Sequence, residues 1–215
     1  KEINAVDAAG VHPLLIAIGK ERYMPFREKV PEEILTIANR LIGSGQTSLA
    51  KHLIIAADDD DPALNTHDIG AYFDHVLSRI DWKRDLHFQT KTTIDTLDYS
   101  GDGWNAGSKV IMACRGDIKR TLGKEIPTNF SLTGDVKNIK LVRPGVLGIE
   151  INKFTDYASA NIEIDKLTAE LKSKNLENYP LILILDDTVF TAKTLNNFLW
   201  VTFTRSNPSH DIYGV

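Results

Sequence analysis

Two acidic clusters are the residues of this sequence whose type and placement best suit chemistry. Four consecutive aspartates occupy residues 58–61 after the apolar run 53–57, and Asp186 and Asp187 follow the apolar run 180–185. Open α/β sheets bind ligands at the carboxyl ends of their strands, and Mg²⁺ prefers carboxylate oxygens. Magnesium-dependent phosphate handling is therefore one hypothesis. The alternative, which we favour, is that these aspartates cap the following helices and remain solvated.

Histidine and cysteine form no recognisable metal or nucleophile pattern. The six histidines show neither an HExxH motif nor an i, i+4 pair, and Cys114 is the only cysteine. Cys114 ends an apolar run, so we predict a buried and unreactive thiol. Glycine-rich phosphate-binding fingerprints are also missing from the sequence. We therefore predict no metal site and assign no catalytic residue within this chain.

Composition narrows the possible partners. The chain has 215 residues, 42% of them hydrophobic and 25% charged, with a formal net charge of -4, which is typical of a globular protein. This balance predicts no nucleic-acid partner. No apolar stretch approaches the roughly 20 residues of a membrane-spanning helix. A single cysteine suits a reducing compartment, so we expect a cytoplasmic location. Because the first residue is Lys1, we interpret the chain as a piece of a longer protein.

Strand-like and helix-like segments alternate along both halves of the chain. Apolar runs of strand length lie at residues 11–18, 53–57, 110–114, 146–151 and 180–185. Helical periodicity lies between them, most clearly over residues 69–80. This alternation predicts an α/β fold of two tandem, similar βαβ-type modules, with mainly parallel sheets covered by helices. A polar stretch at 115–138 places the boundary, giving modules at residues 1–118 and 119–215.

The two halves also share a motif. Arginine and aspartate stand six positions apart at the end of a helix in each half, as Arg79 with Asp85 and as Arg205 with Asp211. The two pairs are 126 residues apart, and so are the acidic pairs that precede them. We interpret this as a duplication; independent use of the same βαβ pattern is the alternative. We expect each arginine and aspartate to fix the turn after its helix, whereas an anion or partner contact is the functional alternative.

Several of these segments together resemble the C-terminal region of UbiD-type decarboxylases. The matching features are the strand 51–55 leading into the aspartates, the helix end and turn at 79–86, the Ile-Asp-x-Leu-Asp-Tyr segment at 94–99 and the Gly-Ser-Lys at 107–109. The resemblance covers about residues 10–115 well. It covers residues 145–215 more loosely, so we interpret the second module as a shortened copy. The sequence departs from the family at Asp74, where the family has Trp, and at Trp82, where it has Pro.

The resemblance implies an activity for the full-length protein and a separate role for this part of it. It implies reversible, non-oxidative decarboxylation of an aromatic or unsaturated acid of the quinone-pathway type, with prenylated FMN and a divalent metal bound by an upstream domain and neither bound by this chain. This chain would supply a pocket wall and contacts for a homo-oligomer, and would be inactive alone. Ile94 and Leu97 match the substrate-facing stretch, and Val76 matches a helix position that approaches the substrate. A non-catalytic oligomerisation module remains the alternative.

Overall fold

The computed structural model describes residues 1–6, 13–23, 26 and 28–215, so residues 11 and 12 of the first predicted strand lie outside it. The chain forms two compact units. The first unit contains Lys1–Lys119 together with Leu199–Ile212, and the second contains Arg120–Phe198 together with Tyr213–Val215. The first unit is therefore built from two separate stretches of the chain, with residues of the second unit between them.

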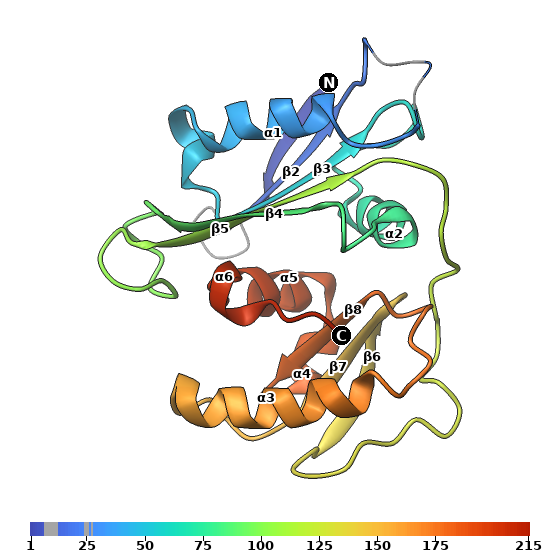
Figure 1. Ribbon diagram of the computed structural model, residues 1–215, viewed down its shortest axis with the longest axis vertical. Coiled ribbons are helices and arrows are strands. Elements are labelled where there is room, and N and C mark those ends of the chain that lie inside the picture. The colour runs from blue at the N-terminus through green and yellow to red at the C-terminus, as the bar shows by residue number, and fades with distance from the viewer. Residues whose placement is uncertain (7–12, 24–25, 27) are drawn as a thin grey trace. The chain divides into compact units, whose positions relative to one another are not determined.

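A five-stranded sheet forms the centre of the first unit, in the order β1-β2-β3-β5-β4. Its strands are β1 (Glu2–Val6), β2 (Leu14–Gly19), β3 (His52–Ala57), β4 (Leu86–Thr92) and β5 (Gly107–Cys114). Helix α1 (Glu33–Ile42) lies on one face, while α2 (Ile69–Arg79) and α6 (Pro208–Asp211) lie on the other (Figure 1). A 3₁₀ turn, η1 (Gly45–Leu49), links α1 to β3. Helices on both faces explain why every residue of β2 and β3 is buried.

Side chains from both helices anchor them to this sheet. Helix α1 buries Ile34, Ala38 and Ile42 against the apolar residues of β2, β3 and β5. The carboxylate of the buried Glu21 accepts hydrogen bonds from the backbone N–H groups of Glu33 and Ile34, which satisfies donors at the first turn of α1. On the other face, the hydroxyl group of Tyr72 donates to the carbonyl oxygens of Ala17 (2.7 Å) and Ile54 (3.0 Å) and so ties α2 to both strands.

The second unit has a three-stranded sheet in the order β6-β7-β8. Its elements are β6 (Asn138–Arg143), β7 (Val146–Glu150), α3 (Tyr157–Leu171), β8 (Leu181–Leu185), α4 (Thr188–Lys193) and the first part of α5 (Leu195–Thr204). Ile149, Leu167 and Leu171 form its core between the sheet and α3. Both units share the order of two antiparallel strands, a helix, a parallel strand and a further helix.

Mixed α/β architecture is confirmed, but the expectation of mainly parallel sheets is not met. Among the described strands, β1–β2, β4–β5 and β6–β7 pair antiparallel, whereas β2–β3, β3–β5 and β7–β8 pair parallel. The sequence does not predict strands β1 and β6, because both strands are short and their residues are partly exposed and mixed in polarity. Within the described residues, no helix has the length and apolar character needed to span a membrane.

Candidate functional site

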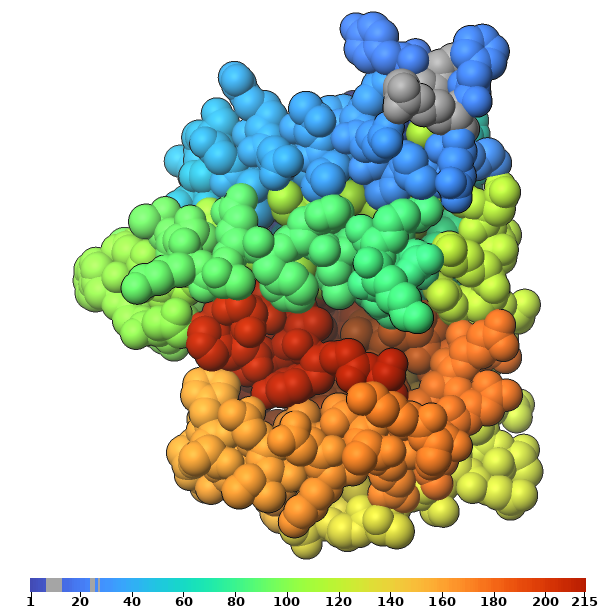
Figure 2. Space-filling view, in the orientation of Figure 1, coloured from blue at the N-terminus to red at the C-terminus, as the bar shows by residue number. Residues whose placement is uncertain are grey.

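The connection between β4 and β5, residues 93–106, holds the segment that resembles a substrate-facing stretch, and we call it the glycine loop. Figure 2 shows this loop as a lobe at the edge of the first unit. Ile94 is 2% exposed and lies under the loop, whereas Leu97 is 57% exposed. Val76 is buried on α2, where its carbonyl oxygen lies 3.7 Å from the Sγ atom of Cys114. Of the three predicted residues, Leu97 alone presents its side chain at the surface.

The glycine loop closes tightly around Ile94. A Cβ atom at Gly101 would lie 2.2 Å from the carbonyl oxygen of Ala106 and 2.6 Å from Cδ1 of Ile94. A Cβ atom at Gly107 would lie 2.8 Å from the same Cδ1 atom. Real Cβ atoms do not approach backbone this closely, so glycine is required at position 101.

The two aspartates of the loop shape its backbone. The Oδ1 atom of Asp95 accepts a hydrogen bond from the N–H group of Leu97 at 2.9 Å. The Oδ1 atom of Asp98 accepts from both the N–H group (2.9 Å) and the hydroxyl group (2.5 Å) of Ser100. Each aspartate therefore stabilises a turn two residues long, which is a common role of this side chain. The loop conformation thus follows from the positions of its own acids.

A buried ion pair fixes the loop to the sheet. The Nζ atom of Lys51 lies 2.8 Å from Oδ2 of Asp98, and it also donates to the hydroxyl group of Ser100 (2.5 Å) and the carbonyl oxygen of Thr204 (3.2 Å). Burial lowers the pKa of Lys51, although the bond and charge of Asp98 oppose this shift. Burial raises the pKa of Asp98, but the hydrogen bonds of Lys51 and Ser100 outweigh it and leave this pKa below its usual value. The ammonium group thus has three hydrogen-bond acceptors, and both carboxylate oxygens of Asp98 have donors.

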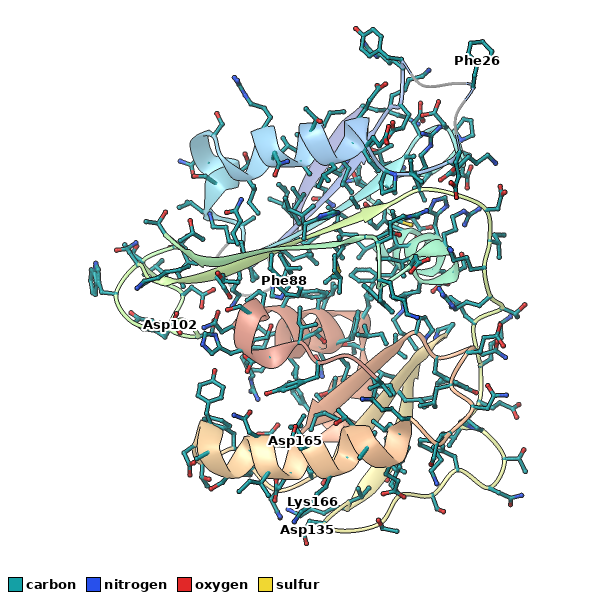
Figure 3. The ribbon with its side chains drawn as sticks, viewed as in Figure 1. Phe26, Phe88, Asp102, Asp135, Asp165 and Lys166 are labelled. Atoms are coloured by element: carbon teal, nitrogen blue, oxygen red, sulfur yellow. The ribbon has the colours of Figure 1, made fainter. Side chains whose placement is uncertain are left out.

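Residues 203–211, which we call the returning segment, complete this region. The side-chain amide of Asn207 donates to Oδ1 of Asp102, which is labelled in Figure 3, at 3.0 Å, and its side-chain oxygen accepts from the hydroxyl group of Ser108. The ring of Phe203 meets the ring of His52 edge to face, with centroids 5.1 Å apart. Helix α6 packs on β4 and β5. A stretch that follows the second unit in sequence therefore covers the face of the first unit that carries the glycine loop.

The aspartates of the two repeated motifs make the same turn. The Oδ2 atom of Asp85 accepts from the N–H group of Asp81 at 2.9 Å, and Oδ2 of Asp211 accepts from the N–H group of Asn207 at 2.5 Å. Both bonds span four residues. The carboxylate of Asp85 also forms an ion pair with Arg84, whose Nε atom is 2.5 Å away. These bonds close the turn after each helix.

The arginines of the two motifs have different surroundings. Arg79 donates through Nη1 to the carbonyl oxygen of His75 at 3.3 Å and to the hydroxyl group of Ser78 at 3.2 Å. The guanidinium group of Arg205 lies over the ring of Trp200, with its Cζ atom 4.6 Å from the centroid. The motif is therefore shared in its aspartate contacts more closely than in its arginine contacts.

The acidic clusters are engaged with groups of the chain itself. Each of the four aspartates after β3 accepts a hydrogen bond, in the pairs Lys1 Nζ to Asp58, Glu21 N to Asp59, Gly116 N to Asp60 and Ala63 N to Asp61. Asp187 caps α4 by accepting from the N–H group of Phe190 at 2.8 Å. Within the described parts of the chain, no three or more His, Cys, Asp or Glu side chains gather as metal ligands. Asp187 therefore has the expected capping role, whereas the four aspartates after β3 bind other parts of the first unit and helix α2 is capped by Asp68.

Two hollows on the described part of the surface do not fit a flavin nucleotide. One, of about 400 Å³, lies between the N-terminus and residues 62–65, and its only cationic side chain, Lys1, is bonded to Asp58 and Pro62. The other, of about 220 Å³, lies in the glycine loop and is lined by Tyr99 and Trp104 without any basic residue. Neither offers the cluster of amides or basic groups that a phosphate needs. These two hollows therefore do not provide a binding site for prenylated FMN.

Comparison with known proteins identifies relatives over most of the chain. An uncharacterised protein of Chlamydia trachomatis is 32% identical over 99% of this chain and 33% of its own length. A protein of Chlamydia pneumoniae, named as a subunit of 4-hydroxybenzoate decarboxylase, is 29% identical over 100% of this chain and 33% of its own length. The chain thus spans about a third of the length of these relatives.

Among solved structures, the vanillic acid decarboxylase of Sedimentibacter hydroxybenzoicus in its open form covers 80% of this chain with 29% of its own, at 14% identity and a TM-score of 0.43. A likeness at this level does not establish a shared fold. The family comparison is stronger. Residues 1–114, slightly more than half of the chain, match the 3-octaprenyl-4-hydroxybenzoate carboxy-lyase C-terminal domain. The chain therefore belongs to the UbiD-type carboxy-lyase family, through the C-terminal domain of that family.

Proposed function

We propose that this chain is the C-terminal part of a prenylated-FMN-dependent decarboxylase that acts on an aromatic or unsaturated carboxylic acid. The match of residues 1–114 to the carboxy-lyase C-terminal domain carries this proposal. The chlamydial relative named for 4-hydroxybenzoate decarboxylase supports an aromatic acid as the substrate class. Because the chain spans about a third of such relatives, we assign the flavin and the divalent metal to a domain outside it.

The glycine loop is the part of this chain that we assign to the substrate pocket. Its exposed apolar side chains are Leu97, Tyr99 and Trp104, at 57%, 85% and 82% exposure. Large apolar side chains gathered on one loop are typical of a surface that another group covers. We assign Leu97 to the wall of the pocket, while buried Ile94 and Val76 support the loop and the helix behind it. A flavin-binding domain is the partner of this surface, in a cytoplasmic homo-oligomer.

A comparison of this chain with the full-length enzyme tests the proposal. The full-length enzyme, loaded with prenylated FMN and a divalent metal, is expected to release CO₂ from 4-hydroxybenzoate or a related aromatic acid. The 215-residue chain alone is expected to bind no flavin and to release no CO₂. Decarboxylation by the isolated chain would contradict the assignment of the cofactor sites to a domain outside it. If the loaded full-length enzyme decarboxylated none of a panel of aromatic and unsaturated acids, the proposed activity would be wrong.

A matched pair of variants tests the assignment of Leu97. Leu97 in the glycine loop and Ile162 on α3 are almost equally exposed, at 57% and 58%. In the full-length enzyme, Leu97→Ala is expected to raise KM by about tenfold, since a lost apolar contact costs about 1–3 kcal/mol. Ile162→Ala is expected to leave KM and kcat unchanged. Equal effects of the two variants would remove Leu97 from the pocket.

A further inference from the structure

Asn207 stands at the N-cap position of α6, yet its side chain makes no bond to that helix. Asparagine is among the residues that usually cap a helix, because its side-chain oxygen accepts from an N–H group of the first turn. Here the N–H group of Ser209 donates instead to the hydroxyl group of Ser108 on β5, at 2.9 Å. A residue of another element thus caps α6, and the side-chain amide of Asn207 is available for other contacts.

The hydrogen bonds of Asn207 have a single possible direction. A carboxylate only accepts, so the side-chain nitrogen of Asn207 must donate to Oδ1 of Asp102, at 3.0 Å. The side-chain oxygen of Asn207 then accepts from the hydroxyl group of Ser108, which itself accepts from Ser209. Asn207 and Ser108 are 1% and 0% exposed, so these bonds are shielded from water. A continuous series of bonds therefore leads from α6 to the glycine loop.

The repeated turn in the first half of the chain has a different arrangement. Asp81 stands 126 positions before Asn207, at the same place in the turn. The carboxylate of Asp81 accepts from the N–H group of Lys83, two residues on, at 3.1 Å. The corresponding N–H group in the second half is that of Ser209, which donates to β5 instead. Asparagine in place of aspartate thus supplies the donor that a bond to Asp102 requires.

The bond from Asn207 reaches the part of the glycine loop that carries Trp104. The N–H group of Asp102 donates to the carbonyl oxygen of Ala106 at 2.7 Å, and the N–H group of Ala106 donates to that of Gly103 at 3.2 Å. These bonds close one tight turn, in which Trp104 is 82% exposed. A contact that fixes Asp102 therefore also fixes the position of Trp104.

We propose that Asn207 is a positioning residue of the substrate pocket, which it affects through Asp102 and the turn that carries Trp104. The hollow of about 220 Å³ in the glycine loop is lined by Trp104 and Tyr99, so a shift of this turn changes its width. The returning segment follows the second unit in sequence, so the second half of the chain helps to shape this surface. The inference rests on our assignment of the glycine loop to the pocket, whereas the effect of Asn207 on the loop can be tested without it.

Hydrogen exchange in the 215-residue chain tests the effect on the loop without any activity. Asn207→Asp keeps the size of the side chain but replaces the donor with an oxygen that faces the carboxylate of Asp102. The amides of Asp102 and Ala106 are expected to exchange at least about tenfold faster, and by a larger factor than the amides of β3. The double variant Asn207→Asp with Asp102→Asn exchanges donor and acceptor, so it is expected to restore slow exchange.

Kinetics of the full-length enzyme, loaded with prenylated FMN, test the effect on the pocket. In Asn207→Asp, kcat/KM for the acid that the enzyme decarboxylates fastest is expected to fall at least about tenfold, and the double variant is expected to recover it. Tyr72→Phe is the matched control, because the hydroxyl group of Tyr72 bonds to β2 and β3 rather than to the glycine loop. It is expected to lower stability and to leave kcat/KM unchanged.

Loop exchange that stays slow in Asn207→Asp, or that stays fast in the double variant, would overturn the effect of Asn207 on the loop. Fast loop exchange with an unchanged kcat/KM would overturn the positioning role. A loaded enzyme without activity would contradict the proposed function, and the positioning role with it, even where exchange confirms the bond.

Circular dichroism shows whether Asn207→Asp folds. If it does not, Asp102→Ala removes the same bond from the side of the loop, where the side chain of Asp102 is 45% exposed. The amide of Ala106 is then expected to exchange faster than in the wild type, with the same loss of kcat/KM. Wild-type exchange in Asp102→Ala would overturn the proposal.

Discussion

The ammonium group of Lys51 and the carboxylate of Asp98 form an ion pair of 2.8 Å, with side-chain exposures of 1% and 5%. Lys51 lies immediately before β3, and Asp98 lies in the glycine loop, 47 residues later in the sequence. The same ammonium group also donates to the carbonyl oxygen of Thr204 in α5. One buried cation thus holds the sheet, the loop and the end of α5 together.

Removing this cation is expected to destabilise the first unit strongly. Lys51→Met leaves the carboxylate of Asp98 buried without its partner, and breaking a buried pair in this way costs about 3–5 kcal/mol. Urea unfolding measures the loss, and hydrogen exchange is expected to show faster exchange in the glycine loop. The double variant Lys51→Met with Asp98→Asn removes both charges and is expected to recover much of the stability. A double variant as unstable as the single one would show that the charges are not the cause.

Stability is expected to fall with acid because two buried histidines are neutral in the folded state. Burial lowers the pKa of His52 to about 3 and that of His75 to about 4. In the unfolded chain their pKa is about 6.5, so below this pH the unfolded state binds more protons than the folded state. The free energy of unfolding therefore decreases from about pH 6.5 toward pH 4, by up to about 1.4 kcal/mol per pH unit for each histidine.

Urea unfolding at several pH values between 7.5 and 4.5 measures this slope. The variant His75→Gln removes one of the two titrating groups, so its stability is expected to depend less steeply on pH. Tyr72→Phe is a suitable control, since it also lowers stability but leaves both histidines in place. A wild-type free energy of unfolding that stays constant down to pH 4.5 would contradict the neutral, buried state of these rings.

Two glycine substitutions are expected to have opposite effects. At Gly101 an added Cβ atom would lie 2.2 Å from the carbonyl oxygen of Ala106, so Gly101→Ala forces the glycine loop apart. At Gly70 in α2 the nearest atom would be Oδ1 of Asp68 at 3.6 Å, an ordinary contact. Gly70→Ala is expected to stabilise α2 by about 0.5–1 kcal/mol. Thermal unfolding compares the two, and a harmless Gly101→Ala would show that the loop does not close as described.

The returning segment is expected to be necessary for a stable first unit. Asn207→Ala removes the bonds to Asp102 and Ser108 and leaves the buried hydroxyl group of Ser108 with one partner fewer, at a cost of about 1–3 kcal/mol. A chain of residues 1–118 is expected to bind the dye ANS and to melt at a lower temperature than the full 215 residues, because the surface beneath Phe203 becomes exposed. A peptide of residues 199–212 added in trans is expected to reverse part of this change. A shortened chain as stable as the whole would contradict this role.

Sequence patterns identified the central strands and one helix of the first unit correctly. The apolar runs at 53–57 and 110–114 lie within β3 and β5, and the helical periodicity over 69–80 corresponds to α2. These elements are buried on the faces that the pattern selects, so local sequence is enough to find them. Strands β1 and β6 lie at sheet edges, where one side of the backbone is open and no continuous apolar run is needed.

The contacts around the glycine loop were not predictable in the same way. Lysine is rarely buried, so nothing in the sequence around Lys51 marks it as an interior residue until its partner Asp98 is placed beside it. Asn207 likewise gains its role only when the chain returns to β5, 99 positions from Ser108. Such pairs depend on the tertiary arrangement, and propensity and periodicity carry no information about it. The Ile-Asp-x-Leu-Asp spacing was the one local signal of this region, since both aspartates form turns with residues two positions on.

The passage of the chain through the second unit before its return to the first has a genetic consequence. A stop codon near residue 118 would delete the second unit together with the returning segment, which covers part of the first unit. A deletion confined to residues 120–198 would instead keep both pieces of the first unit but would have to rejoin them across the gap. Gene loss or recombination at a single breakpoint is therefore harmful here, and the two halves are expected to be inherited together.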